Sequence, residues 1–319
     1  MENINCPLCG NDDYRILFRR KDLRFRVSDI EFSVVRCNAC KLVYVNPRPT
    51  ETELHEYYPD RFYNISADSG RFLAAEEATN TLKYSYLTDM APGSLLEIGP
   101  SKGEFMMFMK QKGWQVHGIE LSEKPANLFN LDIRRGRISD AGYVRESFDL
   151  IVLWAVLEHA YDPCGMLKDL TGLLKPSGRI VAAVTNFSSI PGRFMRHDDV
   201  PRHVVMFSRD TLPRVLLRAG LSMEMLDFNS KLFGGTHRGL LNYLFKLASG
   251  ERLNDIVTQN RVTGMWSDFS SSIKGKPSAM MRLVDGLDGR FTPLVDAAMD
   301  KLGLGFIMVV RASKSDIRI

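Results

Sequence analysis

Residues 95–105 read LLEIGPSKGEF, and this stretch decides the fold. An apolar run carries a carboxylate at Glu97, glycines follow at Gly99 and Gly103, and a helix-forming sequence begins at Glu104. Gly99 permits a tight turn, and Gly103 lets a ligand approach the N-terminus of the next helix. The stretch therefore predicts a strand, a glycine loop and a helix within an α/β sheet.

The glycine spacing distinguishes this loop from the common phosphate-binding loops. A dinucleotide loop would read Gly-x-Gly-x-x-Gly, whereas this one reads Gly-x-x-x-Gly, and no Gly-Lys-Ser/Thr ending follows. A carboxylate at Glu97 would repel a pyrophosphate and suits a ligand with an ammonium group. Glu120 ends the next strand, about 20 residues after Gly99, where an acidic group can accept hydrogen bonds from both ribose hydroxyls. Together these features favour a nucleoside with an amino-acid tail over NAD.

Strands and helices alternate on both sides of the loop. The pattern predicts strands over 94–98, 116–119, 149–154, 179–184 and 222–228, with helices over 103–112, 125–129, 163–174 and 210–219. This alternation is typical of a doubly wound, mostly parallel sheet with helices on both faces. Nearer the N-terminus, Thr50 and Glu53 form a capping-box pattern for a helix over 51–58, and a further helix is expected over 71–90.

The cysteines give a second strong signal. Four of the five form two Cys-x-x-Cys pairs, at Cys6 and Cys9 and at Cys37 and Cys40. Each pair can sit on a tight knuckle, and two knuckles complete the tetrahedral sulfur shell that zinc favours. Two disulfides or redox pairs are the alternatives, but a cytosolic chain disfavours disulfides, and a redox motif uses one pair at a helix start. Four thiolates leave no open position, so the expected zinc is structural.

Several longer motifs together resemble one enzyme family. They are EIGPSKG (97–103), GIELS (118–122), FDLIVLWAVLEHAYDP (148–163), LLKPSGRI (173–180) and PRHVVMFS (201–208). As a set they resemble a class I S-adenosylmethionine-dependent methyltransferase. The cysteine pairs followed by NPRPT (46–50) resemble the branch with an N-terminal zinc ribbon, which includes sugar C-methyltransferases and surface-polysaccharide-associated enzymes. The resemblance implies a seven-stranded, Rossmann-like sheet whose last strand, over 305–312, runs antiparallel between the fifth and sixth.

The resemblance also implies a cofactor site for S-adenosylmethionine. Its contacts would come from Glu97, Gly99, Pro100, Gly103, Glu120, Leu121, Ser139 and Trp154. Glu97 would hold the amino group, Glu120 the ribose and Leu121 the adenine face. Ser139 or its neighbour Asp140 would reach the adenine edge. Trp154 would face the sulfonium, to which an aromatic ring is attracted as to any cation.

Two of the six histidines are expected at the active face. His159 follows the fourth strand, and His203 follows the fifth in a loop that also holds Arg193 and Asp199. Methyl transfer often requires removal of a proton from the acceptor, and histidine is the natural base. Both are therefore candidate catalytic residues, with a purely structural role as the alternative. The polar loop suits an oxygen-rich or anionic acceptor.

These motifs suggest four regions. We expect a zinc ribbon over 1–48, a helical linker or lid over 49–92, a cofactor-binding core over 93–230 plus 304–313, and a helical insertion over 231–303. The aromatic residues between Tyr57 and Tyr63 either cover the cofactor or pack the ribbon onto the core. The insertion could wall the acceptor site, form a dimer contact, lie on a membrane or add a helical layer.

The expected function is methyl transfer to an oxygen or carbon of a small-molecule or glycan-precursor acceptor. One alternative is an RNA methyltransferase whose ribbon holds RNA. Against it, the fourth strand ends at Trp154 without the Asn/Asp-Pro-Pro-aromatic signature of enzymes that methylate exocyclic amino groups. The other is a non-catalytic ribbon scaffold, against which the complete Glu97, Gly99, Gly103 and Glu120 set argues. The 319 residues are 45% hydrophobic, a composition that argues against a disordered chain, and the net charge of +4 neither indicates nor excludes nucleic acid. The missing signature and the mixed charges of the ribbon make nucleic acid an unlikely partner. No secretory signal or spanning segment is apparent, so we expect a cytoplasmic protein, with peripheral membrane contact and the oligomeric state left open.

Overall fold

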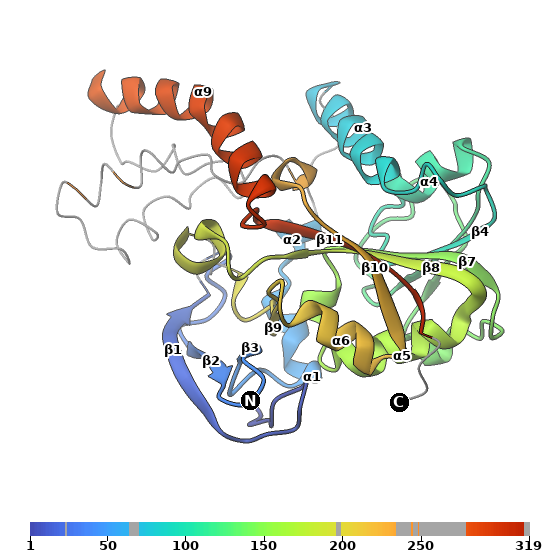
Figure 1. Ribbon diagram of the computed structural model, residues 1–319, viewed down its shortest axis with the longest axis horizontal. Coiled ribbons are helices and arrows are strands. Elements are labelled where there is room, and N and C mark those ends of the chain that lie inside the picture. The colour runs from blue at the N-terminus through green and yellow to red at the C-terminus, as the bar shows by residue number, and fades with distance from the viewer. Residues whose placement is uncertain are drawn as a thin grey trace.

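Two sheets organise the computed structural model, which describes residues 1–22, 24–63, 70–195, 199–233 and 279–315 together with residues 244 and 248. A seven-stranded sheet forms the centre, and a four-stranded sheet lies beside it (Figure 1). The strands are β1 (Tyr14–Lys21), β2 (Glu31–Cys37), β3 (Val43–Val45), β4 (Ser94–Ile98), β5 (Gln115–Glu120), β6 (Ile133–Arg135), β7 (Phe148–Trp154), β8 (Leu174–Thr185), β9 (Val205–Met206), β10 (Leu221–Phe228) and β11 (Ile307–Lys314). The helices are α1 (Glu51–Leu54), α2 (Asp60–Tyr63), α3 (Gly70–Ser85), α4 (Glu104–Gln111), α5 (Pro163–Leu173), α6 (Leu212–Arg218) and α9 (Ala279–Lys301).

The central sheet has the order β10-β11-β8-β7-β4-β5-β6. Strands β6, β5, β4, β7 and β8 pair in parallel, whereas β11 pairs antiparallel with both β8 and β10. The last strand is therefore inserted antiparallel beside the fifth parallel strand, as the family resemblance implied. The expected doubly wound methyltransferase sheet is confirmed.

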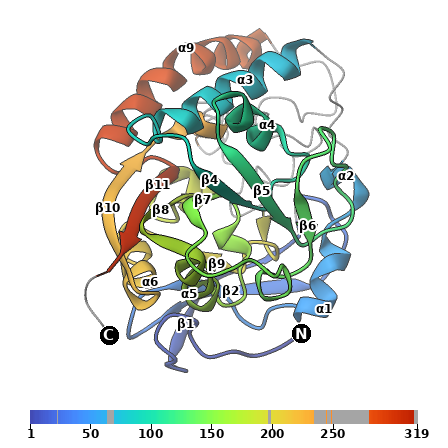
Figure 2. The same cartoon turned by 90° about the vertical axis from the view of Figure 1, so that its right-hand side faces the viewer.

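Helices cover both faces of this sheet. Figures 1 and 2 show α3, α4 and α9 on one side and α5 and α6 on the other. One buried cluster joins the sheet to α5 and α6 through Leu167, Leu170 and Val215, and the other joins it to α4 through Phe105 and Met106. The central strands β4, β7 and β8 are rich in apolar residues because both their faces are largely buried.

The small sheet joins the N-terminal region to the core. Its order is β1-β2-β3-β9, and the last pairing, Tyr44 with Val205, links the cysteine-bearing segment to the loop that follows β8. One face of this sheet packs into the large cluster through Val35 and Tyr44, while the other packs on Phe187. The ribbon is therefore built into the wall of the core, although the exact region boundaries stay predictions.

Some expected elements differ in the structure. Residues 125–129 form no helix, because the side chain of Asn127 brackets the chain by bonding both the carbonyl and the N–H of Leu131, at 2.8 and 3.0 Å. The capping box at Thr50 and Glu53 is present, but α1 ends at Leu54 and continues only as a 3₁₀ turn to Tyr57.

Most of the predicted insertion over 231–303 lies outside the described residues, which in this range are 231–233, 244, 248 and 279–303. Within the last of these segments, α9 is one continuous helix that includes Pro293. Of the helices that are described, none combines the length and apolar character needed to cross a bilayer.

Candidate active site at the carboxyl edge of the sheet

The expected site residues gather at one edge of the central sheet. Strands β4, β5, β7 and β8 run in parallel, so their carboxyl ends meet there (Figure 2). Glu97 is near the end of β4, Glu120 ends β5, and Trp154 ends β7. In open α/β sheets this edge is where ligands bind.

The glycine loop is shaped to admit a ligand. Gly99 and Gly103 have φ values of +68° and +88°, which side-chain-bearing residues rarely adopt. A Cβ on Gly99 would lie 2.8 Å from a methyl of Val156, and one on Gly103 would lie 3.0 Å from Leu131. The loop therefore brings bare backbone to the start of α4, as a close-fitting ligand requires.

Glu120 is held in a fixed orientation by that loop. The Ser101 N–H donates to its Oε2 at 3.1 Å, and the Ser122 N–H donates to its Oε1 at 3.0 Å. Burial raises the pKa of Glu120, and these N–H groups and Arg135 oppose the shift. A carboxylate fixed in this way keeps lone pairs for two vicinal hydroxyls. Glu120 is therefore suited to accept hydrogen bonds from the ribose hydroxyls of a nucleoside.

Glu97 is buried and incompletely satisfied. Its side chain is nearly inaccessible, and its Oε2 has no hydrogen-bond partner among the described residues. Burial raises the pKa of Glu97 to about 7, aided by Glu104 and Glu120 and opposed by Lys83. A buried carboxylate with an unused acceptor is a suitable partner for the ammonium group of an amino-acid tail.

Trp154 forms part of a cationic binding corner. Its ring packs edge-on against Phe105, with centroids 5.3 Å apart, and the indole Nε1 is buried without a partner. The Lys83 ammonium on α3 lies 5.2 Å from the Phe105 ring centre and 5.6 Å from that of Trp154. The two rings can thus attract a cation such as a sulfonium, and burial lowers the pKa of Lys83, which lessens the repulsion between its charge and that cation.

The remaining expected cofactor residues line the same edge. Pro100 is buried in the glycine loop, while Leu121 is 72% exposed directly after Glu120, as an open adenine platform would be. Ser139 is exposed in a 3₁₀ turn after β6, where its hydroxyl donates to Asp140 at 2.9 Å. These positions fit the expected nucleoside. The contacts themselves stay predictions.

His203 lies beside a small, partly open pocket at the end of β8. The cavity is lined by Thr185, Asn186, Phe187, Gly192, Asp199, Val200, His203, Met206 and Phe306. His203 Nε2 is 3.1 Å from the Asp199 carboxylate. Burial alone would lower the pKa of His203, but Asp199 and Glu158 outweigh it and raise the pKa above its usual value. Among the described residues no polar atom bonds Nδ1, so this nitrogen can serve a ligand.

His159 lies next to His203 but has a different environment. The two rings are 4.7 Å apart and nearly perpendicular. His159 Nδ1 is 3.0 Å from the Arg202 carbonyl, to which it must donate, and 2.9 Å from the Tyr58 hydroxyl oxygen. Burial, followed by the charge of His203, lowers the pKa of His159 to about 3. His159 is therefore neutral and fixed in one tautomer, and is better suited to positioning than to proton transfer.

The ribbon contributes directly to this centre. The Arg202 guanidinium donates to Asp199 at 2.8 Å and to Asp22, just after β1, at 2.9 Å. Arg24 donates to the other oxygen of Asp199 at 2.8 Å. The ligand atoms of His159, Asp199 and His203 lie close enough for a metal ion, but two guanidinium groups already neutralise Asp199. That charge balance disfavours a second cation there.

Glu158 is the other carboxylate near His203. It is fully buried, its Oε1 accepts from the Thr185 N–H at 3.4 Å, and its Oε2 has no partner among the described residues. Burial raises its pKa, and the positive charge of His203 opposes the rise. Glu158 can therefore stabilise a protonated His203.

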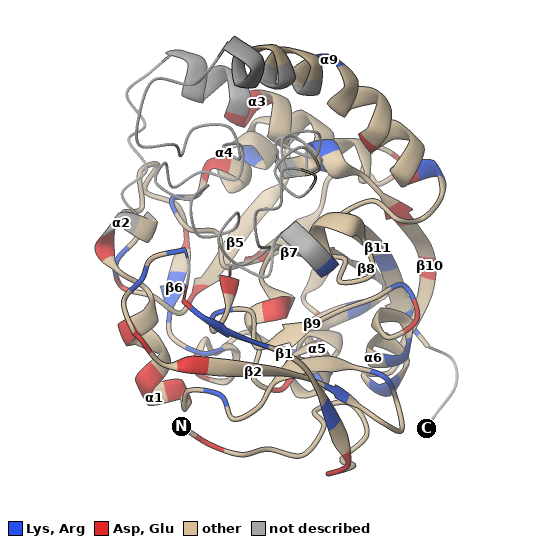
Figure 3. Cartoon of the chain, turned by 90° about the vertical axis from the view of Figure 1, so that its left-hand side faces the viewer, with Lys and Arg blue, Asp and Glu red and all other residues tan. Residues whose placement is uncertain are grey.

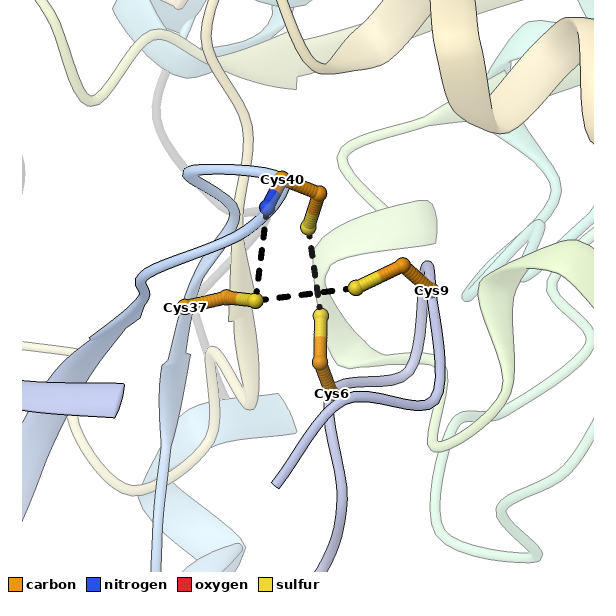
Figure 4. A group of neighbouring side chains, drawn as sticks. All are labelled: Cys6, Cys9, Cys37 and Cys40. Carbon is orange, nitrogen blue, oxygen red and sulfur yellow. Dashed lines mark hydrogen bonds between the residues drawn. The ribbon is translucent and has the colours of Figure 1, made fainter. Parts of the chain in front are cut away.

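The four ribbon cysteines converge on one point (Figure 4). The Sγ atoms of Cys6 and Cys40 are 3.3 Å apart, and those of Cys9 and Cys37 are 3.6 Å apart. A disulfide would bring two sulfurs to about 2 Å, whereas tetrahedral Zn–S bonds of about 2.3 Å place them about 3.8 Å apart. All four sulfurs lie within 4.8 Å of one another, so the cluster fits a zinc ion.

The sequence did not indicate several of these residues. Asp22 and Arg24 of the ribbon bond Arg202 and Asp199. Tyr58 of the linker bonds His159, and Lys83 of α3 lies over the Trp154 ring. All four are far along the chain from these partners. Tyr57 packs edge-on against Phe32 of β2, so this part of the aromatic cluster joins the linker to the ribbon. Only the three-dimensional arrangement reveals these roles.

Known proteins resemble this chain in sequence. A family model described as "Methyltransferase domain" matches residues 70–226. The ubiquinone biosynthesis O-methyltransferase of Vibrio campbellii is 22% identical over 237 residues, covering 66% of this chain and 96% of that protein. The enzyme of that name from Aeromonas salmonicida is 23% identical over 198 residues, covering 56% and 82%.

A solved structure from Thermotoga maritima, described as a SAM-dependent methyltransferase and possible histamine N-methyltransferase, aligns with a TM-score of 0.46 and 18% identity. It covers 80% of this chain and 98% of that one. The family match spans the glycine loop and the strands that carry Glu97, Glu120 and Trp154. The chain is therefore an enzyme of the class I S-adenosylmethionine-dependent methyltransferases.

Proposed function

We propose that the enzyme transfers a methyl group to a hydroxyl oxygen of a small molecule, and that His203 accepts the hydroxyl proton. One observation carries the proposal: His203 lines the cavity with Nε2 held by a buried carboxylate and Nδ1 without a partner among the described residues. S-adenosylmethionine supplies the electrophilic methyl group. The relatives named ubiquinone biosynthesis O-methyltransferase support oxygen as the acceptor atom.

The proton transfer follows from the surroundings of His203. A neutral His203 keeps its proton on Nε2, facing Asp199, and offers the Nδ1 lone pair to the acceptor hydroxyl. When that proton arrives, Asp199 and Glu158 stabilise the imidazolium. Arg202 and Arg24 keep Asp199 ionised, since their charges outweigh its burial and hold its pKa well below the usual range. The arrangement is that of an oriented general base.

The cavity supports a small acceptor. Its walls combine apolar side chains, including Phe187, Met206 and Phe306, with polar groups at Asn186 and His203. A pocket of this mixed polarity suits an acceptor that has both apolar and polar groups. It opens at the end of β8, next to the strand that ends at Trp154, so the acceptor would lie beside the expected methyl group.

The cofactor and metal assignments belong to the same proposal. We assign the amino group of S-adenosylmethionine to Glu97, its ribose to Glu120 and its sulfonium to the corner at Trp154. We assign a structural zinc to Cys6, Cys9, Cys37 and Cys40. The metal would hold the ribbon in the position from which Asp22 and Arg24 reach the loop of His203.

Transfer of a labelled methyl group to a panel of hydroxylated acceptors tests the proposal. The panel contains catechols, other phenols and hydroxylated sugars, and mass spectrometry identifies the methylated atom. We expect a methyl ether, and we expect His203→Asn to lower kcat by about 10²–10⁴ because a general base is lost. S-adenosylhomocysteine binding should be unchanged in that variant. A methylated nitrogen, or full activity in His203→Asn, would contradict the proposal.

A further inference from the structure

The linker contacts both the proposed cofactor site and the proposed acceptor site. Its residues 57–60 connect the turn after α1 to α2, and Figures 2 and 3 show these two helices next to β6, the strand at one end of the sheet order. This segment touches residues 121–125, which we call the adenosine loop because they directly follow Glu120. It also touches the loop that carries Arg202 and His203.

Two cations hold neighbouring carbonyl groups of this segment. Arg202 donates to the Tyr57 carbonyl at 2.9 Å, and the Lys124 ammonium donates to the Tyr58 carbonyl at 2.8 Å. Lys124 also pairs with the Asp60 carboxylate at 2.9 Å. Hydrogen bonds from charged donors are stronger than those between neutral groups. The main chain of the linker is therefore held at adjacent peptide groups, by the acceptor side and by the adenosine loop.

The side chain of Tyr58 extends this connection to the histidines. Its hydroxyl oxygen lies 2.9 Å from His159 Nδ1, and the two ring centres are 6.2 Å apart. The same Nδ1 donates to the Arg202 carbonyl at 3.0 Å, so the hydroxyl oxygen is a second acceptor for that N–H. The His159 ring packs edge-on against the His203 ring, with centres 4.7 Å apart. A rotation of His159 would therefore displace the ring of the proposed base.

The adenosine loop is itself organised around Glu120. The Ser122 N–H donates to the Glu120 carboxylate at 3.0 Å, and the Ser122 hydroxyl accepts from the Lys124 N–H at 3.2 Å. The Arg135 guanidinium donates to the carbonyls of Ser122 and Pro125. A ribose held by Glu120 would fix this carboxylate and, through Ser122, the backbone that carries Lys124. When one ligand orders a segment that a second site also uses, the second site has less ordering left to do.

We infer that Tyr58 is a positioning residue which, together with Lys124, transmits occupancy of the cofactor site to His159 and thereby sets the orientation of the His203 ring. The inference rests on the proposed function for the ribose at Glu120 and for the acceptor at His203. Because coupling between two binding sites is reciprocal, each ligand then favours the binding of the other.

NMR of the histidine imidazole groups in the full-length, zinc-loaded enzyme tests the inference, with the resonances assigned from His159→Gln and His203→Asn. We expect saturating S-adenosylhomocysteine to shift the resonances of both rings in the unaltered enzyme. Tyr58→Phe removes only the hydroxyl, and Lys124→Met removes only the ammonium group from a chain of similar length. Both variants should still bind S-adenosylhomocysteine but should lose most of the shift.

Tyr161→Phe is the matched control. The Tyr161 hydroxyl also bonds the linker, at the Pro49 carbonyl, 2.6 Å away. This control should keep the full shift, because the hydroxyl that it loses is bonded to the linker and not to His159.

The outcomes separate the coupling from the cofactor site. A full shift in either Tyr58→Phe or Lys124→Met would overturn the inference, since the cofactor would then affect the histidines without the linker. Binding of S-adenosylhomocysteine with no histidine shift in the unaltered enzyme would also overturn it, while leaving the cofactor site intact. Loss of the shift in Tyr161→Phe would assign the effect to the linker as a whole and contradict the role of Tyr58. No binding to the unaltered enzyme would contradict the cofactor site, and the inference with it.

Discussion

Arg202 and Asp22 form a fully buried ion pair, 2.9 Å apart, between the loop that carries His203 and the N-terminal ribbon. The same guanidinium bonds Asp199, which in turn holds His203. A residue of the N-terminal ribbon is thus three contacts away from the proposed base. The ribbon therefore supports the loop of His203 as well as carrying the four-cysteine cluster.

Removing the ribbon end of this pair should be strongly destabilising. Asp22→Ala leaves a buried guanidinium with one carboxylate fewer, and we expect the free energy of unfolding to fall by about 3–5 kcal/mol. Urea unfolding measures the change. Asp29→Asn is the control, since Asp29 is exposed and pairs with Lys21 at the surface. Equal stability of Asp22→Ala and the unaltered protein would show that the network contributes little.

The two neighbouring histidines should titrate very differently. Asp199 and Glu158 raise the pKa of His203, whereas burial lowers that of His159 to about 3. NMR titration of the imidazole resonances should therefore show His203 protonating above the usual histidine range and His159 remaining neutral to the acid limit of the fold. Asp199→Asn should move the His203 titration to lower pH. Identical titrations of the two rings would refute the assignment.

The same histidines affect stability with opposite signs. The raised pKa of His203 contributes stability that is complete below the pKa of an unfolded histidine and is lost as pH rises through its folded value. The lowered pKa of His159 contributes stability above the unfolded value, which is lost as pH falls. Unfolding of His159→Gln across pH should therefore show less destabilisation by acid than the unaltered protein.

Cofactor binding should displace a proton from Glu97. Its pKa of about 7 means that about half the molecules carry this proton at pH 7, and a bound ammonium group would lower the pKa. Calorimetry of S-adenosylmethionine binding in buffers of different ionisation enthalpy should detect the released fraction. Glu97→Gln should abolish that component. Proton release that is unaltered in Glu97→Gln would assign it to another group.

Metal removal should loosen the ribbon and the active site together. Cys9→Ser removes one of four sulfurs, so we expect zinc content and thermal stability to fall, while Cys164→Ser, the cysteine outside the cluster, should change neither. Mass spectrometry under native conditions measures the metal. A protein that keeps its melting temperature after chelation would contradict a structural zinc.

The sequence predicted the central sheet well because β4, β7 and the second half of β8 are rich in apolar residues. Its failures have physical causes. Residues 125–129 have a helix-like sequence, but the side chain of Asn127 bonds the N–H and carbonyl of Leu131, and no helix forms. The strands β6 and β9 have only 3 and 2 residues, which is too short for a periodic pattern.

The part of the site that lies in contiguous motifs could also be predicted from the sequence. Glu97, Glu120 and Trp154 occur in contiguous motifs at strand ends, and the structure brings them to one edge. The partners of His203 are different, because the contact between Asp22 and Arg202 joins residues 180 positions apart. No local pattern encodes such a contact. It arises only when β3 and β9 pair and bring the ribbon against the loop.

Titration of S-adenosylmethionine and S-adenosylhomocysteine into the unaltered enzyme, Glu120→Gln and the exposed control Glu123→Gln tests the central claim most directly, with NAD as the control ligand. We expect both adenosyl ligands to bind the unaltered enzyme and Glu123→Gln alike. Binding to Glu120→Gln should be weaker by about 10- to 100-fold, as for the loss of hydrogen bonds to a charged group, and NAD should not bind. Equal affinity in Glu120→Gln, or binding of NAD in place of S-adenosylmethionine, would contradict the cofactor site described at the ends of β4 and β5.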